Sequence, residues 1–401
     1  MKEKGFRILV LSFYYPPDLS AGSFRVSSLI GALQKKLPEG SRIDVVSTIP
    51  NRYSSYLMNA PEEEHLGNLT VKRIRLPGHR NGVVDQSKAF ITYWREVIKF
   101  VAGKEYDLVF GTSSRLMTAV LAAHVAYMKG SALYLDIRDI FVDTIGDVFS
   151  RATALVVTPL FAQLERWAVL RADKVNLISR GFSAYFQGRY PRQSFSYFTN
   201  GIDAEFLDIP VFADPWGARK SIPTVLYAGN VGDGQGLHRI LPGLATKMRG
   251  RALFKVIGDG GRQGMLKAAV ASAGADNVVF SSPVERDALI AEYASADILF
   301  LHLNDFEAFK KVLPSKLFEY AATGKPIWAG VSGYAAEFIG QEIKNAQVFP
   351  PCNDLLAMQA FDQIDLWWTD RTSFIEKFSR LTIMNAMAED VCSVAMKRKQ
   401  L

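Results

Sequence analysis

The 401-residue sequence contains little cysteine and has no long apolar run. Its two cysteines, Cys352 and Cys392, lie near the C-terminus, which argues against a disulfide framework and suits a reducing compartment. Residues 1–5 lead directly into a short apolar stretch, so we expect no signal peptide. No apolar run approaches the roughly 20 residues that span a bilayer. We therefore expect a cytoplasmic protein, either soluble or peripheral at the cytoplasmic face of the inner membrane.

Three familiar ligand-binding motifs are also missing. No Asp-x-Asp occurs in the sequence, so the usual carboxylate clamp for a divalent metal is absent and we expect no metal and no other cofactor. The glycine-rich segment 229–236 lacks the G-x-G-x-x-G spacing of dinucleotide sites, and no Gly-Lys-Ser/Thr follows it. The sequence thus disfavours NAD binding and a Walker A loop.

Acidic residues are too few to balance the basic ones, and the net charge is +7. The imbalance is concentrated between residues 70 and 104, where only Asp85 and Glu96 are acidic. The basic residues there are Lys72, Arg73, Arg75, Arg80, Lys88, Arg95, Lys99 and Lys104, beside several aromatic and aliphatic residues. This pattern fits contact with an anionic membrane surface, and it equally fits an ordinary surface helix with one buried face. Nucleic acid is disfavoured as a partner.

The chain is long enough for two domains, and its composition, 49% hydrophobic and 22% charged, is globular. Strand and helix patterns alternate along it, which predicts an α/β fold with parallel sheets. The pattern restarts after a Pro-rich stretch, which predicts two facing Rossmann-like domains with a cleft between them. The expected parts are a first domain 1–207, a linker 208–222, a second domain 223–370, and a C-terminal helix 371–401 returning to the first domain.

Ligands of such sheets bind at the carboxyl ends of the strands, where helices begin. Gly22 follows the first strand, and Arg25 would add a charge in the next helical turn. Gly229 with Asn230 and Gly258 follow strands of the second domain. Each glycine turn is either a phosphate contact or a structural turn.

The segment from Pro314 to Pro326 is more informative. Pro314 suits the first position of a helix, which would place Lys316 in the first turn, where the helix dipole disfavours a cation unless an anion is bound. Glu319 comes one turn later and would accept ribose hydroxyls, while Lys316 and the helix start near Ser315 would hold a diphosphate. The alternative is an exposed helix with an incidental ion pair.

A third cluster ends a strand of the first domain. Asp136, Arg138 and Asp139 are charged residues at the edge where the crevice is expected. The alternative interpretation is a structural Asp–Arg pair that holds a loop.

The order of these motifs resembles the family-4 retaining glycosyltransferases of the GT-B fold over essentially the whole chain. Within that family it is most similar to the bacterial polysaccharide group that includes N-acetylfucosaminyltransferases. The resemblance rests on Tyr14-Tyr15-Pro16-Pro17 with Ala21-Gly22-Ser23, Ile137-Arg138-Asp139, Thr199-Asn200-Gly201-Ile202-Asp203, Gly229-Asn230-Val231-Gly232 with Gln235-Gly236-Leu237, Gly258-Asp259-Gly260, and Pro314-Ser315-Lys316 with Glu319-Tyr320 and Gly324-Lys325-Pro326.

The resemblance implies a role for each site residue. Arg138, Asp139 and Lys316 would be catalytic, lying near the reacting sugar or its diphosphate. The donor contacts would be Gly22, Gly229, Asn230, Gly258, Ser315, Lys316, Leu317 and Glu319. The chain departs from the broad family where Lys311 stands in place of a second glutamate, and where Asn230 and Gln235 replace an arginine and a lysine. Lys316 should therefore hold a larger share of the phosphate charge.

The implied function is transfer of a hexosyl or N-acetylaminosugar group from a nucleoside-diphosphate donor, expected to be a UDP-sugar. The acceptor would be a glycan or a polyprenyl-diphosphate-linked saccharide of a bacterial surface polysaccharide such as lipopolysaccharide, with retention at the anomeric carbon. Two other classes remain open: an epimerase or phosphorylase of the same fold, and a non-catalytic nucleotide-sugar-binding subunit.

Overall fold

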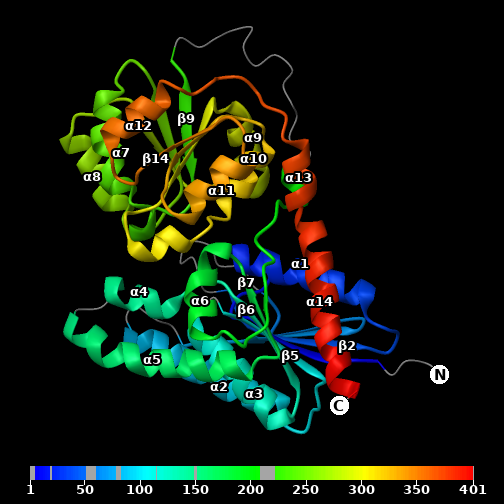
Figure 1. Cartoon of the computed structure of the whole chain (residues 1–401). Helices are drawn as coiled ribbons and strands as arrows, with labels where there is room; N and C mark the ends of the chain where they lie inside the picture. Colours follow the sequence, from blue (N-terminus) through cyan, green and yellow to red (C-terminus); the bar gives the residue numbers. More distant parts are fainter. Residues whose placement is uncertain are drawn as a thin grey trace. The chain divides into compact units, whose positions relative to one another are not determined.

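A computed structural model describes residues 5–18, 20–50, 60–77, 83–113, 115–148, 151–207 and 222–400 (Figure 1). The chain forms two compact α/β units. The first unit comprises Met1–Asn200 and Arg380–Leu401, and the second comprises Gly201–Ser379. The two-domain α/β architecture with parallel sheets that the sequence predicted is confirmed.

The first unit is built on an eight-stranded sheet, ordered β3-β4-β2-β1-β5-β6-β7-β8. All neighbouring strands are parallel except β3, which is antiparallel to β4. The strands are β1 Arg7–Leu11, β2 Arg42–Thr48, β3 Glu63–Leu66, β4 Leu69–Ile74, β5 Leu108–Ser113, β6 Ala132–Ile137, β7 Lys174–Leu177 and β8 Phe195–Ser196.

Helices cover both faces of this sheet. Those on one face are α1 Ala21–Lys36 and α14 Arg380–Gln400, and those on the other are α2 Val83–Val101, α3 Leu116–Lys129 and α5 Arg151–Arg171 (Figure 1). The shorter α4 Phe141–Val148 and α6 Ser183–Arg189 flank α5 and β8. The central strands are buried on both faces, as the apolar run of β1 shows, because the helices exclude water from both sides.

The second unit carries a fully parallel six-stranded sheet, ordered β11-β10-β9-β12-β13-β14. Its strands are β9 Thr224–Ala228, β10 Leu253–Ile257, β11 Val278–Ser281, β12 Ile298–His302, β13 Ile327–Gly330 and β14 Ala346–Phe349. Its helices are α7 Leu237–Lys247, α8 Gln263–Ser272, α9 Arg286–Ser295, α10 Lys316–Ala322, α11 Tyr334–Glu342, α12 Asp354–Phe361 and α13 Thr372–Phe378. Trp328 is fully buried at the centre of its core and donates a hydrogen bond of 3.1 Å to the carbonyl of Ala357.

The boundaries of the units differ from the expected ones. The predicted linker 208–222 lies outside the described residues except for Ile222. Residues 201–207 belong to the second unit, because Ile202 bridges to Ser379 and the Phe206 ring stacks on Tyr293. The expected single helix 371–401 is two helices. Helix α13 packs its Phe374 and Phe378 against Phe318 in the second unit, and only α14 joins the first.

Along the described chain, no helix is both long and apolar enough to cross a membrane.

Candidate functional site

The candidate site of the second unit lies where its strand order reverses, between β9 and β12. Successive connections leave that point in opposite directions, which opens a space at the carboxyl ends of the two strands. Gly229 follows β9 directly, and Lys316 opens α10 after the loop that follows β12. The topology thus brings together two motifs that are far apart in the sequence.

Lys316 lies directly over Gly229. A Cβ added to Gly229 would be 2.0 Å from Nζ and 2.5 Å from Cε of Lys316, so the ammonium occupies the space that a side chain at this position would take. Gly229 also has φ +148°, which disfavours any side chain. The cation therefore lies against exposed backbone at the end of β9.

The helix start differs from the predicted one. Helix α10 begins at Lys316 with Ser315 as its N-cap, and Pro314 precedes the helix. Because α10 has only seven residues, its dipole contributes little, and the positive charge here is mainly that of Lys316. Leu317 is fully buried and its amide donates to the Pro314 carbonyl, so we remove it from the predicted donor contacts.

Glu319 lies one turn after Lys316 and is half-buried. Burial raises the pKa of its carboxyl, and the opposing influences are the charge of Lys316 and a hydrogen bond from Tyr293. The Tyr293 hydroxyl donates to Oε2 at 3.0 Å, and the Tyr293 side chain is itself fully buried. A lysine and a fixed carboxylate within one helical turn provide separate groups for an anion and for hydroxyls.

A second glycine brings the turn after β10 against the turn after β9. Gly258 has φ +146°, and a Cβ there would lie 1.8 Å from the Gly229 carbonyl oxygen. Beside it, the Asn230 side-chain amide donates to Oε1 of Gln235 at 2.8 Å, and the Gly232 amide donates to the same oxygen at 3.1 Å. Asn230 and Gln235 thus hold the shape of this loop. They are the two positions where the sequence departs from the arginine and lysine of the family it resembles.

Two buried polar side chains, at the end of β12 and two residues after it, hold that loop in place. The Cys352 amide donates to Nε2 of His302 at 3.0 Å, so the ring proton is on Nδ1, which lies 2.7 Å from the Gln235 carbonyl. Burial lowers the pKa of His302 to about 4, so the imidazole is neutral near pH 7. Asn304 donates to the Asp233 carbonyl at 2.9 Å. The neutral side chains of His302 and Asn304 therefore hold the glycine-rich loop in its conformation.

In the first unit, Arg138 reaches the turn after β1. A Cβ at Gly22 would lie 2.2 Å from Nη1 of Arg138, so this glycine allows the guanidinium to lie against the start of α1. Asp139 is exposed in the loop after β6. The predicted residues Gly22 and Arg138 are thus adjacent.

Asp136 and Arg25 are structural, not ligand-binding. Arg25 is 1% exposed and forms two hydrogen bonds of 2.9 Å to the Asp136 carboxylate. It also donates to the carbonyls of Phe198 and Thr199, both at 2.7 Å. Burial alone would raise the pKa of Asp136, but the charge and hydrogen bonds of Arg25 outweigh it and lower the pKa. The expectation that Arg25 adds charge to an anion site was wrong, because its guanidinium is already paired.

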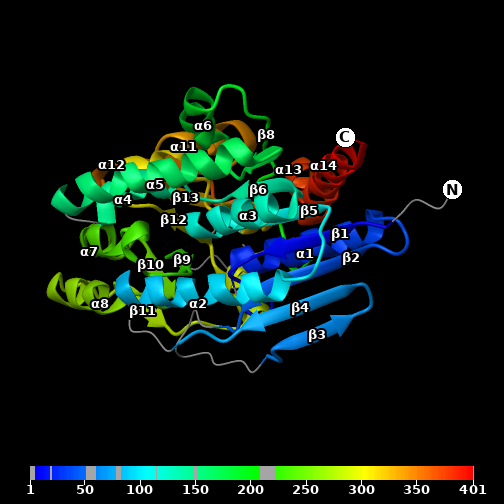
Figure 2. The ribbon, with the colours of Figure 1, turned by 90° about the horizontal axis from the view of Figure 1, so that it is seen from below.

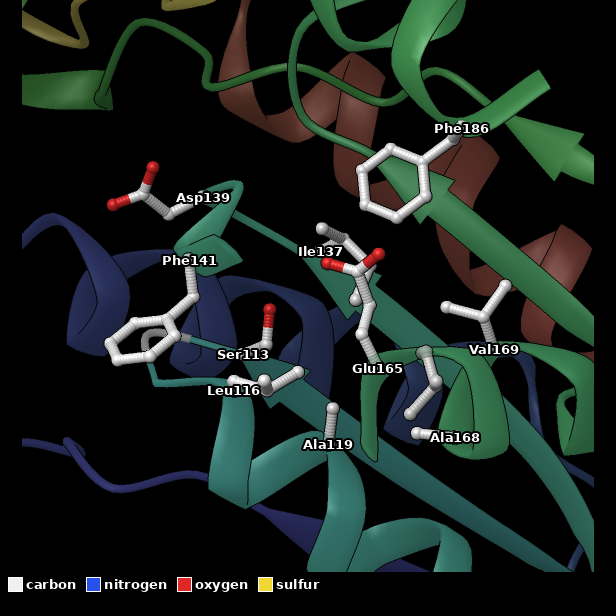
Figure 3. Close-up of a pocket in the computed structure, with 11 residues that line it drawn as sticks. Ser113, Leu116, Ala119, Ile137, Asp139, Phe141, Glu165, Ala168, Val169 and Phe186 are labelled. Carbon is white, nitrogen blue, oxygen red and sulfur yellow. The ribbon is translucent and has the colours of Figure 1, made fainter. Parts of the chain in front are cut away.

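A small pocket in the first unit contains a carboxylate that the sequence did not reveal (Figure 3). Glu165 of α5 lies among apolar groups that include Ile137, Val169 and Phe186. Tyr190 donates to its Oε1 at 2.9 Å, and burial raises the pKa of the carboxyl. Because a tyrosine satisfies this carboxylate, we interpret it as a structural tie between α5 and the chain after α6.

Sequence patterns had no means of identifying Tyr293, His302 or Glu165. Each stands in an apolar stretch that predicts only a strand or a helix, and its polar partner is distant in the sequence. Among the residues that the structure describes, no group of three or more His, Cys, Asp or Glu side chains is placed to hold a metal ion.

Residues 209–379 match the family model "Glycosyl transferases group 1". Over 228 residues the chain is 26% identical to WcaI of Escherichia coli (strain K12), named as a colanic acid biosynthesis glycosyl transferase. That match covers 54% of this chain and 56% of the relative, so the chain spans about half the length of the curated relative it matches.

Solved structures of similar fold extend over nearly the whole chain. The trehalose 6-phosphate synthase of Burkholderia multivorans superimposes with a TM-score of 0.71 at 13% identity, covering 99% of this chain and 98% of its own. The Anabaena protein HepE, solved in complex with UDP, has a TM-score of 0.63 at 15% identity and covers 96% and 100%. The chain thus has the GT-B fold, and nearly all of its second unit matches the group 1 glycosyl transferases.

Proposed function

We propose that this chain is a glycosyltransferase that binds a nucleoside-diphosphate sugar in its second unit. The observation that carries the proposal is the Lys316 ammonium held over the bare backbone of Gly229, one turn before the Tyr293-bound Glu319. The match of residues 209–379 to group 1 glycosyl transferases supports it.

The proposed chemistry follows from these two groups. Negative charge develops on the leaving diphosphate as the sugar–oxygen bond breaks, and the fixed ammonium of Lys316 stabilises that charge. Glu319 accepts hydrogen bonds from the ribose hydroxyls and fixes the nucleoside. In the first unit, Arg138 and Asp139 act near the reacting sugar. The same proposal includes retention of configuration at the anomeric carbon and transfer without a bound metal ion.

For the substrates we propose a UDP-sugar carrying a hexose or an N-acetylaminosugar such as N-acetylfucosamine. The similarity in fold to HepE, which was solved with UDP, supports uracil as the base of the donor. The similarity to WcaI supports an acceptor in bacterial surface polysaccharide synthesis. The acceptor is a glycan or a polyprenyl-diphosphate-linked saccharide, presented at the cytoplasmic face of the inner membrane. We also propose that part of the basic segment 70–104 contacts this membrane.

A product assay with UDP-, GDP- and dTDP-sugars tests this function. Purified protein is incubated with each donor and with lipid-linked acceptors, with and without EDTA, and products are analysed by mass spectrometry. We expect release of nucleoside diphosphate together with a glycosylated acceptor, unchanged by EDTA. Consumption of donor without any acceptor product would instead indicate an epimerase or phosphorylase, and nucleotide binding without turnover would indicate a binding subunit.

Tyr293→Phe is expected to raise KM for the donor by about tenfold, because one hydrogen bond that fixes Glu319 is lost. That hydrogen bond lowers the pKa of Glu319, so its removal should also move the acidic limb of the kcat/KM profile to higher pH. Steady-state kinetics across pH measure both effects.

Tyr106→Phe is the matched control, since Tyr106 donates a similar hydrogen bond of 2.7 Å to Asp44 in the first unit. This variant should leave the donor KM unchanged. Equal effects from the two variants would show that Tyr293 does not act through Glu319.

A further inference from the structure

The outer faces of α2, α3 and α5 form one layer on the first unit. Helix α3 packs against both α2 and α5, and Figure 2 shows the three side by side. The Trp94 ring of α2 lies 5.3 Å from the His124 ring of α3. At the other side, the Arg171 guanidinium of α5 lies 4.1 Å from the Tyr127 ring of α3. These contacts make the three outer faces a continuous surface.

Large apolar side chains project from this layer. Six of them are more than half exposed: Ile91, Tyr127, Met128, Leu155, Leu160 and Leu170, and Leu155 reaches 77%. A single exposed leucine is ordinary in a folded protein, but a group of this size on adjoining helices marks a binding surface.

The same surface is strongly basic. Its cations are Lys88, Arg95, Lys99, Lys129, Arg166 and Arg171, whereas the described acidic side chains of these helices are Asp85, Glu96 and the buried Glu165. On α2, Lys88, Ile91, Arg95 and Lys99 follow at helical spacing along one exposed stripe, so cations and an apolar side chain share a face.

The cations in and just after strand β4, the other part of the basic segment 70–104, are paired with carboxylates. Its Lys72 and Arg73 pair with Glu63 and Glu64 of β3, at 3.5 Å and 2.5 Å. Arg75, just after β4, lies 3.4 Å from Glu62. The cations of β4 are thus neutralised within the sheet. On α2, Lys99 pairs with Glu96 at 2.6 Å on the exposed helix surface, whereas Lys88 and Arg95 stand exposed beside Ile91.

We infer that α2, α3 and α5 form a docking surface for an anionic lipid bilayer. Apolar side chains beside cations suit the boundary between acyl chains and anionic headgroups, where the leucines enter the bilayer and the lysines and arginines meet phosphate. A protein partner of equal size would need an acidic apolar face, whereas a bilayer presents both chemistries everywhere. This inference extends the proposed membrane contact to α3 and α5 and involves no residue of the donor site.

Cosedimentation of the full chain with lipid vesicles tests the inference. Wild type is expected to bind phosphatidylglycerol-rich vesicles at least about tenfold more tightly than phosphatidylcholine vesicles, and to lose most of that preference in high salt. Leu155→Ser with Leu160→Ser, and separately Lys88→Glu with Arg95→Glu, should each weaken binding by about tenfold or more.

Matched controls come from exposed residues of the second unit. Leu355→Ser with Met265→Ser again replaces two exposed apolar side chains with serine, and Lys267→Glu with Lys344→Glu again reverses two exposed positive charges. Both controls should leave vesicle binding as in wild type. Equal losses from control and test variants would overturn the inference. So would a wild-type dimer in analytical ultracentrifugation that Leu155→Ser with Leu160→Ser dissociates, because the surface would then join two copies. Nucleotide binding, measured on the same variants, reports separately on the donor site.

Discussion

Lys316→Ala is expected to lower kcat by about two to three orders of magnitude while the fold is retained. The half-buried ammonium lies against the backbone of Gly229, and the glycine-rich loop 229–236 beside it contains no lysine or arginine. Without Lys316, the charge that develops on the leaving diphosphate loses its nearest fixed cation. Steady-state kinetics give the effect, and circular dichroism checks the fold.

Lys310→Ala is the matched control for this experiment. Lys310 stands on the same connection before α10, but its side chain is 42% exposed and pairs with Glu307. We expect this variant to keep the activity of wild type. If the kcat of Lys316→Ala stayed within a few-fold of the wild-type value, Lys316 would have no part in the mechanism.

Arg25→Met should destabilise the first unit by about 3–5 kcal/mol, because it leaves the buried Asp136 carboxylate without its cation. Both side chains are 1% exposed, and two hydrogen bonds of 2.9 Å join them. Urea unfolding of wild type and variant measures the loss. Nucleotide binding by the folded variant should persist, since no donor contact of the second unit is altered.

The double variant Arg25→Met with Asp136→Leu should recover part of that stability, since neither charge is then left unpaired. The pH dependence gives a second check. Because the folded state lowers the pKa of Asp136, its contribution is present above the ordinary value of 3.8 and is lost as the pH falls through the lowered value. An Arg25→Met protein as stable as wild type would show that the pair does not hold the first unit together.

The sequence predicted the regular part of the fold well because each central strand is a short apolar run between polar turns. Strands β6 and β10 begin and end where the periodicity placed them. Short elements were missed: β3 reads Glu-Glu-His-Leu, is mostly exposed, and is held by pairing with β4 and by ion pairs. Its residues carry no apolar pattern because β3 is the edge strand of the sheet and most of its side chains face solvent.

For the site, glycine and charge patterns identified positions but not partners. The sequence singled out Lys316, Gly229 and Gly258 because a cation at a helix start and glycines after strands are locally unusual. That the Lys316 side chain covers Gly229 depends on the reversal of strand order at β9 and β12, which no local pattern encodes. Arg25 was misassigned for the same reason, since Asp136 is distant in the sequence and Arg25 in a first helical turn resembles an anion contact.

The central claim, that Lys316 grips the diphosphate of a nucleotide donor, is tested most directly by titration calorimetry. Wild type and Lys316→Ala are each titrated with UDP, GDP and dTDP. For the diphosphate that binds wild type most tightly, the affinity is compared with that of the corresponding nucleoside monophosphate. We predict that wild type binds the diphosphate more tightly, and that Lys316→Ala loses about tenfold of that preference while monophosphate binding changes little. An unchanged diphosphate preference in Lys316→Ala would contradict the claim.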